Sequence, residues 1–376
     1  MSFLHTLWTE WNWYCQDVIV AVLLVILFFT GRELSSREYW RQAFKRVFER
    51  PLICISFAIL CIYVLIAVLD SVGYHPLLRD KDGIVMRSTK TDKKLYDEEG
   101  LSVLDLMLSG LRNAKEKTYS APLAANQFSK EMMVNDDGTM ERGYPKLKHL
   151  HLLGTDRVGT DVLYMSLKAV RTGIIIGAFT TLLVIPFAIL FGVVAGYFGG
   201  IVDDIIQYIY TVLSSIPSIF LIMAFIIVYG RGLTQLCIIM GVTSWTGLCR
   251  VLRGETLKLR ESDYVQAAEA MGVSRFRIIT KHLIPNVMHI VLITAVLSFS
   301  GRVLAEAVLS YLGIGVGGDT MSWGVMINDA RLELARSPVI WWKLCAAFVF
   351  MLGLVLPANL FGDAVRDALD PKLRTQ

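Results

Sequence analysis

The sequence predicts an all-helical membrane protein with six core transmembrane helices and a polar insertion after the first of them. Three observations lead to this fold class. Hydrophobic residues make up 54% of the 376 residues, and the mean hydropathy is +0.52. Charged residues make up 19%, whereas about 25% is typical of soluble domains. The apolar residues are also gathered in blocks that approach the roughly 20 residues a helix needs to cross a bilayer.

Six apolar segments have the length of a transmembrane helix. They are 52–69, 172–195, 205–228, 233–249, 287–309 and 339–361. Prolines such as Pro186 and Pro217 fall inside them, and we expect these to be tolerated because neighbouring helices can satisfy the backbone groups that a proline frees. A seventh apolar run, 18–29, is short. Two interpretations of it stay open: an extra span near the N-terminus, or an amphipathic segment at the membrane surface.

Clusters of Lys and Arg predict which loops face the cytoplasm. Such clusters occupy 32–50 and 250–285, and a smaller one follows residue 362. Placing all three in the cytoplasm agrees with six crossings and puts the end of the chain there as well. The long stretch 70–150 is then extracytoplasmic, because long loops translocate largely regardless of their charge. We therefore expect a multi-pass protein of the inner or plasma membrane with a cytoplasmic C-terminus.

Four regions follow from this topology. They are an N-terminal extension with the candidate extra span (1–36), an amphipathic elbow helix joined to the first core span (37–69), the extracytoplasmic insertion (70–150), and a core domain (151–376) with a cytoplasmic loop at 250–286.

The cytoplasmic loop carries clear helix signals. Asp263 and Gln266 have the spacing of a capping box. Gly272 is placed to take the left-handed conformation that ends a helix, and Ser274 can cap a second short helix. Pro285 is expected to break that second helix where the next span begins. The loop is therefore predicted to be a helix–glycine–helix elbow between two spans.

The first helix of this elbow is predicted to have one apolar stripe and one face of small residues. Tyr264, Ala268 and Met271 are spaced as one apolar stripe. Ala267 and Ala268 form a small face that another backbone can approach closely. A rigid elbow of this kind could pass a push from a docked partner into the spans. By composition alone, an ordinary helical loop is the alternative.

This loop resembles the signature loop of ABC-importer permeases. That signature runs Glu-Ala-Ala, three residues, Gly, nine residues, then Ile-x-Leu-Pro, and here its spacing is intact from Ala267–Ala268 through Gly272 to Pro285. Gln266 stands in place of the usual Glu, and His282 replaces the usual Ile as in peptide permeases. In the family the loop docks into a cleft of a separate ATPase subunit. The resemblance thus implies six ATPase-docking residues: Gln266, Ala267, Ala268, Gly272, Arg275 and Arg277.

Five further segments resemble the oligopeptide/dipeptide permease family, C-type subunit, in the right order. They are HLLGTDRVGTDVL at 151–163, AGYFGGIVDD at 195–204, SIPSIFLIM at 215–223, EAVLSYLGIGV at 306–316 and GDAVRDALDPKL at 362–373. The resemblance implies an importer that works by alternating access. Its expected partners are a homologous second permease, two ABC ATPase subunits, an extracytoplasmic solute-binding protein and membrane lipid, with no nucleic acid. The cargo stays open, because nickel and sugar-linked peptides use similar subunits.

Arg302 and Glu306 are the sharpest charges inside a predicted span. They lie four residues apart on one helix face and are expected to pair with each other. Two interpretations stay open: an outer gate or pathway lining, or a snorkelling ion pair near the interface.

Several chemistries have no candidate residues. No Gly-Lys dipeptide occurs, so there is no P-loop, and ATP and Mg²⁺ are expected on the partner ATPase rather than on this chain. No hydrolase motif is present, which predicts a subunit that is not an enzyme and has no cofactor. His149 and His151 are too few for a metal site, and the Gly-Thr-Asp repeats at 154–161 predict a capped turn entering the second span. The six cysteines lie in or beside apolar blocks and predict packing residues.

Two other functions are compatible with a membrane protein of this composition. An ion-driven secondary transporter would need inverted repeats and ionisable groups at mid-membrane, of which the spans offer little beyond Arg302 and Glu306. A membrane anchor or receptor displaying 71–148 would leave the cytoplasmic elbow unexplained.

Overall fold

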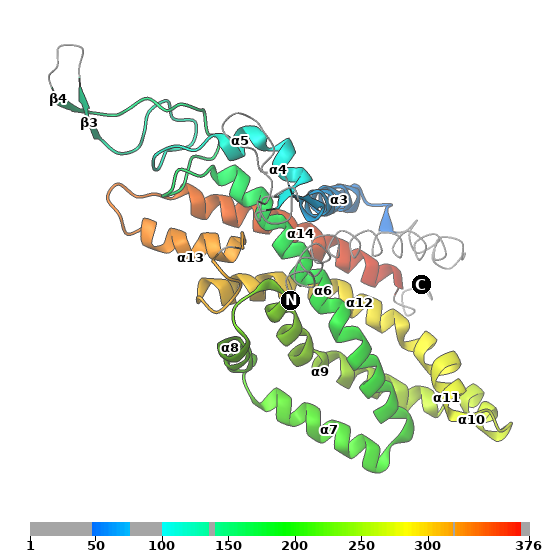
Figure 1. Ribbon diagram of the computed structural model, residues 1–376. Coiled ribbons are helices and arrows are strands. Elements are labelled where there is room, and N and C mark those ends of the chain that lie inside the picture. Colours follow the sequence, from blue (N-terminus) through cyan, green and yellow to red (C-terminus); the bar gives the residue numbers. More distant parts are fainter. Residues whose placement is uncertain (1–46, 76–99, 135–139, 319, 370–376) are drawn as a thin grey trace, which may run out of the picture. The chain divides into compact units, whose positions relative to one another are not determined.

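The computed structural model describes residues 47–75, 100–134, 140–318 and 320–369, which are mostly helical (Figure 1). Three predicted features lie outside the described residues. They are the candidate extra span at 18–29, most of the amphipathic helix before the first core span, and the end of the C-terminal tail. The chain divides into two units. One contains 61–171 and 333–346, and the other contains 43–60, 172–332 and 347–376.

Within the described residues, five helices are long and apolar enough to cross a membrane. They are α3 (Pro51–Ser71), α6 (Val162–Phe198), α9 (Leu233–Arg260), the continuous helix Arg275–Tyr311, and α14 (Trp342–Leu369). A bent pair, α7 (Gly200–Ser215) and α8 (Ser218–Tyr229), passes the same test when taken together. These helices coincide with the six predicted core spans.

The third predicted span is not one straight helix. α7 and α8 meet at an angle of 83°, with Ile216 in an extended conformation and Pro217 before the first residue of α8. A residue that precedes proline is sterically driven out of the helical region, so the chain turns at this point. Pro186, in contrast, lies inside α6 as expected. Pro217 is thus accommodated by a sharp bend between two helices, and Pro186 within one continuous helix.

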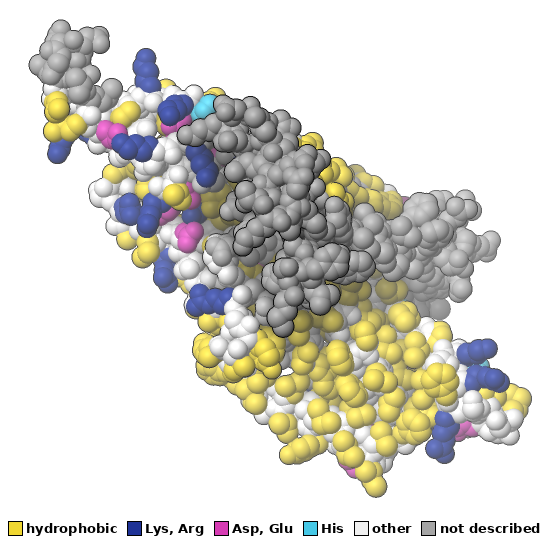
Figure 2. Space-filling view, in the orientation of Figure 1, with side chains coloured by type: hydrophobic (Ala, Val, Ile, Leu, Met, Phe, Trp, Pro, Cys, Tyr) yellow, Lys and Arg dark blue, Asp and Glu magenta, His cyan; other side chains and the backbone are white. Residues whose placement is uncertain are grey.

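Large hydrophobic side chains remain exposed on the outer surface of the second unit. Figure 2 shows them as a broad apolar surface over α6 and α7. They include Phe179, Leu182, Leu190, Ile201, Ile205 and Tyr208. So large a contiguous apolar surface is rare on soluble monomers and is suited to lipid or to another membrane subunit.

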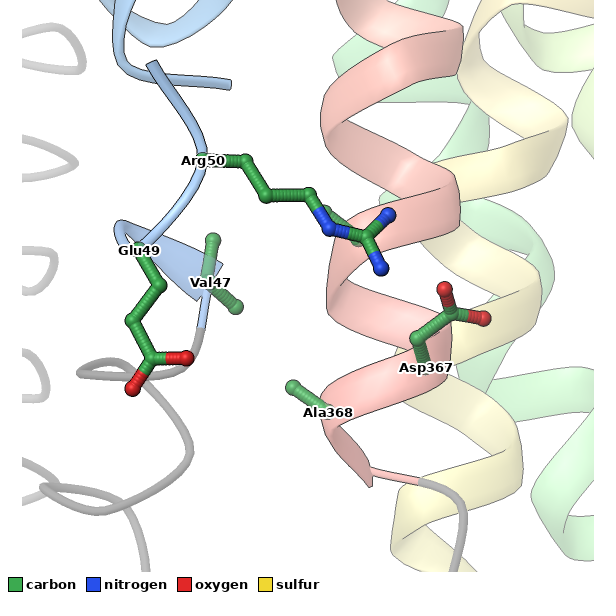
Figure 3. Close-up of a pocket in the computed structure, with 6 residues that line it drawn as sticks. Val47, Glu49, Arg50, Asp367 and Ala368 are labelled. Carbon is green, nitrogen blue, oxygen red and sulfur yellow. The ribbon is translucent and has the colours of Figure 1, made fainter. Parts of the chain in front are cut away.

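The start of the first core span and the end of the last lie together. Residues just before α3 and at the end of α14 line one cavity of about 260 Å³, across which Arg50 and Asp367 point toward one another (Figure 3). The Phe57 and Phe361 rings are also in contact, with centroids 5.5 Å apart. These two helix ends therefore share one membrane face, as an even number of crossings requires. That this face is cytoplasmic stays a prediction.

In its described residues, the insertion contains short strands and helices. β1 (Gly73–Tyr74) pairs antiparallel with β2 (Leu101–Ser102), and the short helices α4 (Val103–Met107) and α5 (Ser109–Asn113) follow. A second antiparallel hairpin joins β3 (Glu131–Val134) to β4 (Met140–Gly143). α13 (Trp323–Glu333) lies between the last two long helices in the sequence.

A buried ion-pair network attaches α4 to the ends of two spans. The Lys168 ammonium of α6 lies 2.7 Å from the Asp70 carboxylate of α3 and 2.9 Å from the Asp105 carboxylate of α4. Tyr164 donates a hydrogen bond of 2.7 Å to Asp105, and Ser102 caps α4. Burial alone would raise the pKa of Asp105, but the bonds from Ser102, Tyr164 and Lys168 outweigh it and lower the pKa to about 2.

The Gly-Thr-Asp repeats form the predicted capped turn. Asp161 accepts hydrogen bonds from the backbone N–H groups of Leu163 and Tyr164 in the first turn of α6, and its other oxygen lies 2.7 Å from the buried His151 ring. Gly159 has a φ of +77°, and a Cβ there would overlap the carbonyl of Glu116. The repeat thus fixes where α6 begins.

We expect Lys168→Met to loosen α4. The substitution leaves Asp70 and Asp105 buried without their shared cation, which costs about 3 kcal/mol. Hydrogen exchange of the α4 amides, measured by mass spectrometry in detergent, should then accelerate roughly 100-fold. Lys117→Met is the control, because Lys117 pairs with Glu131 at an exposed site and should contribute under about 1 kcal/mol. Equal acceleration in the two variants would contradict this role for Lys168.

Candidate functional site

The elbow is built on α10 (Asp263–Ala270), which packs against the helix bundle through two residues. Val265 is fully buried and Ala268 is 3% exposed, and both belong to a core cluster with Ile278 and Leu283. The predicted stripe of Tyr264, Ala268 and Met271 is therefore wrong at both ends, because Tyr264 is 42% and Met271 76% exposed. Met271 lies beyond the last helical residue, so helical spacing does not apply to it.

The N-terminus of α10 also differs from the expectation. Ser262, not Asp263, is the N-cap residue, and the Gln266 side chain donates to the Glu261 carbonyl at 3.1 Å rather than closing a capping box. The helix begins one residue earlier than the predicted box requires, which puts Asp263 in the first turn. Its carboxylate there is favourable toward the helix dipole.

Gly272 ends α10 as predicted. Its φ is +76°, its N–H donates to the Glu269 carbonyl at 2.9 Å, and the Val273 N–H donates to the Ala268 carbonyl at 3.1 Å. These two bonds form a Schellman motif, which glycine favours because it adopts positive φ without strain. Ser274 then precedes α11 (Arg275–Ile278), although its side chain makes no capping bond.

The second helix of the elbow does not stop before the next span. α11 continues through a π-helical turn, η1 (Ile279–Leu283), into α12 (Ile284–Tyr311). The Ile284 N–H donates to the carbonyl of Ile279, five residues back. Pro285 follows this wider turn without breaking the helix. Proline in a helix normally clashes with the carbonyl group four residues earlier. In a π turn the hydrogen bonds run to the residue five positions earlier, so the backbone is wider and this clash is relieved. The expected break at Pro285 is thus wrong.

Most of the residues implied as ATPase-docking are exposed in this arrangement. Gln266, Ala267, Gly272, Arg275 and Arg277 are exposed, whereas Ala268 faces the bundle. Lys and Arg side chains gather at this end of the second unit (Figure 2).

The structure adds two apolar residues that sequence reasoning missed, Met271 and Phe276. Each is 76% exposed at the tip of the elbow. The available signal was a bulky apolar residue on either side of the Gly272 turn in an otherwise polar loop.

Two contacts from the elbow and one from the adjoining end of α9 hold the end of α6. The Tyr197 hydroxyl donates to the Glu269 carboxylate of α10 at 2.7 Å. The Arg260 guanidinium donates to the Tyr197 carbonyl at 3.3 Å, and the Arg275 guanidinium lies over the Phe198 ring, 5.8 Å from its centroid. A displacement of the elbow must therefore carry the end of α6 with it.

A bidentate ion pair joins α7 to α9 beside these contacts. Asp203 accepts from Arg253 Nε at 2.5 Å and from Nη2 at 2.6 Å, and Gln207 donates to it at 3.1 Å. Asp204, the next residue, is exposed. Asp203 is buried and paired with a residue 50 positions away, a contact with no local sequence signal.

Arg302 and Glu306 do not pair as expected. Arg302 Nη1 donates to the Thr181 hydroxyl of α6 at 2.8 Å. The Glu306 side chain is 1% exposed and accepts from the Ser310 hydroxyl one turn further along α12 at 2.7 Å. The two side chains bond to different neighbours. Their separation of four residues on one helix therefore does not produce an ion pair.

Arg302 lines a cavity of about 180 Å³ between α6, α9 and α12. The other lining residues are Thr181, Val184, Ile185, Ser244, Gly247, Leu248, Thr294, Ala295 and Ser298. In the described part of the chain, no group of three or more His, Cys, Asp or Glu residues could hold a metal ion.

The chain is similar to known transport proteins. Residues 188–375 match the family described as "Binding-protein-dependent transport system inner membrane component". The dipeptide transport system permease protein DppC of Bacillus subtilis is 34% identical over 224 residues, which cover 60% of this chain and 69% of that protein. The oligopeptide transport system permease protein OppC of Haemophilus influenzae is 34% identical over 238 residues, or 63% and 76% of the two chains. OppC of Escherichia coli K12 is 32% identical over 252 residues, or 67% and 82%.

Among solved structures, an inward-facing conformation of the MetNI methionine ABC transporter aligns with a TM-score of 0.46 and 17% identity. It covers 55% of this chain and 97% of that one.

We expect Asp203→Asn to destabilise the second unit by about 2 kcal/mol, because charge-assisted bidentate bonds to Arg253 are lost while the guanidinium stays largely buried. The melting temperature of the purified chain in detergent should fall by about 4 °C. Asp204→Asn changes the neighbouring exposed carboxylate in the same way and should leave the melting temperature unchanged. A similar shift in both variants would mean that the charge of this turn, and not the ion pair, sets the stability.

Proposed function

Because the chain belongs to the family of binding-protein-dependent transport system inner membrane components, we propose that it carries peptides and is driven by an ATPase bound at the α10–α11 elbow. Family membership makes it a multi-pass inner-membrane permease subunit of an ABC transporter, without catalysis of its own, that works with ATPase and binding-protein partners. The peptide cargo is supported by relatives named as dipeptide and oligopeptide permeases at 32–34% identity.

The exposed tip of the elbow is the observation that carries the docking proposal. Met271 and Phe276 present large apolar side chains to solvent on a short rigid element, and such side chains at the centre of an interface supply most of its binding energy. Gln266 and Arg277 are exposed polar residues on α10 and α11 and are suited to the polar rim of an interface, and Ala267 is exposed beside Gln266. Ala268 contributes from below, because its small side chain lets α10 sit close to the bundle.

The helix that follows the elbow can transmit a movement of the docked ATPase into the membrane. Arg275–Tyr311 is one helix of 37 residues, so it extends about 55 Å from the docking surface to the far end of the span. The Tyr197–Glu269 hydrogen bond engages α6 in the same movement. Nucleotide binding on the ATPase and substrate access in the membrane are then linked by a coupling free energy.

The remaining parts of the transporter follow from this assignment. A homologous second permease would complete the pathway, two ATPase subunits would drive it, and an extracytoplasmic binding protein would deliver the peptide. Alternating access then requires the elbows to follow the ATPases as these close. Arg302 and Glu306 lie on the helix that starts at the elbow, which supports a pathway or gate role for them.

Gly272→Asp is expected to leave membrane insertion intact and to abolish ATP-dependent peptide uptake. A Cβ at Gly272 meets nothing within 4 Å in this chain, so the substitution causes no clash, although it strains a backbone with positive φ. A loss of uptake larger than that of an equally strained control would therefore come from the partner that approaches there. Uptake into proteoliposomes and recovery of the ATPase with the tagged chain are the two readouts.

Gly200→Asp is the matched control for this variant. Gly200 also has a positive φ, +51°, and open space around its Cβ, but it lies outside the elbow at the start of α7. It should therefore keep the ATPase bound. Normal uptake with Gly272→Asp would refute the docking role.

A further inference from the structure

An unbalanced positive charge lies among the membrane-spanning helices. A guanidinium has five N–H donors, but among the described residues Arg302 makes a hydrogen bond only to Thr181, and its buried Nε finds no partner there. Within the ranges that the structure describes, no carboxylate forms an ion pair with it. Charged groups inside a membrane bundle normally pair or face a water-filled cavity, because leaving them unpaired is costly.

Asp203 and Glu306 are the buried acidic residues in the described part of the same unit, and both are already engaged. Asp203 is bound by Arg253 through two hydrogen bonds. Glu306, one turn from Arg302 on α12, is buried and bonded to Ser310. Neither carboxylate forms an ion pair with Arg302. We therefore look for its counter-charge in an anion that binds from outside the chain.

The cavity that Arg302 lines has the chemistry to receive an anion. Hydroxyl groups reach it from three helices, and those of Ser244, Thr294 and Ser298 form no hydrogen bond within the described chain. Together with Arg302 they offer several donors converging on one space, which suits a carboxylate. A water molecule takes about 30 Å³, so the cavity of about 180 Å³ has room for a carboxylate with some of its hydration.

We propose that this cavity binds the C-terminal carboxylate of a peptide in transit, with Arg302 as its counter-cation. The inference rests on the proposed function, since peptide cargo defines the ligand. Every linear peptide with a free C-terminus has this carboxylate whatever its side chains, whereas Arg302 would repel the terminal ammonium. One cation with hydroxyl groups also makes a weak site, as transport requires, because a substrate must leave each site it enters.

The test compares a free peptide with its amide in the complete transporter. Proteoliposomes containing this chain, the second permease, the ATPases and the binding protein would be supplied with tri-alanine or tri-alanine amide, each at concentrations that saturate the binding protein. The measured quantity is the ATP-dependent uptake rate of tri-alanine divided by that of tri-alanine amide. Because the binding protein is the same throughout, a change in this ratio between variants reports on the membrane chain.

Arg302→Gln should lower the ratio on the order of tenfold, since a charge-assisted hydrogen bond to the carboxylate is lost. Arg302→Lys keeps the charge and should retain most of the preference. Arg250→Gln is the control, because Arg250 lies over the Tyr210 ring on another face of α9 and does not line the cavity. It should leave the ratio unchanged.

Ser298→Leu keeps the experiment decisive if Arg302→Gln fails to assemble. It fills the cavity without removing the guanidinium, and it too should lower the ratio. An unchanged ratio in an assembled Arg302→Gln transporter, or in Ser298→Leu when Arg302→Gln does not assemble, would overturn the proposal and assign Arg302 to a structural contact with a neighbouring subunit. Absence of ATP-driven uptake of both peptides by the unmodified transporter would instead refute the peptide function itself.

Discussion

The packing of Val265 and Ala268 against the bundle is the contact on which the proposed transmission depends. A short helix outside the membrane can pass on a movement only if it is held to the spans, and these two residues bury α10 in the same cluster as Ile278 and Leu283. The Schellman turn at Gly272 then fixes the direction in which α11 leaves. Because α11 runs on into α12, Phe276 at the exposed tip and Arg302 at the membrane cavity lie on one continuous helix.

Two arginines of the second unit, Arg253 and Arg302, differ in how their charges are balanced. Asp203 and Arg253 satisfy each other with bidentate geometry, which joins α7 to α9 near the elbow and supplies a fixed support. Arg302 has one hydroxyl partner and a cavity in front of it. A bundle that pairs one arginine fully and leaves another largely unpaired is consistent with a structural role for the first and a transient ligand for the second.

Local signals in the sequence were sufficient for the spans, the elbow and its Gly272 turn, because length, hydropathy and a required positive φ are properties of short segments. Contacts between distant segments were not accessible in this way. Nothing near Asp203 indicates Arg253, and the spacing of Arg302 and Glu306 suggested a pair that the surrounding helices override. Pro285 was misjudged because a π turn, which has no simple sequence signature, accommodates it.

The most direct test of the account places a photo-crosslinking amino acid at Met271, at the exposed tip of the elbow, with Tyr208 on the exposed face of α7 as the control position. Adducts formed in cells would be identified by mass spectrometry. The account predicts an adduct with an ABC ATPase from position 271 and none from position 208. Efficient crosslinking at 271 that captures no ATPase would contradict ATPase docking at the elbow, because the elbow would then contact a different protein.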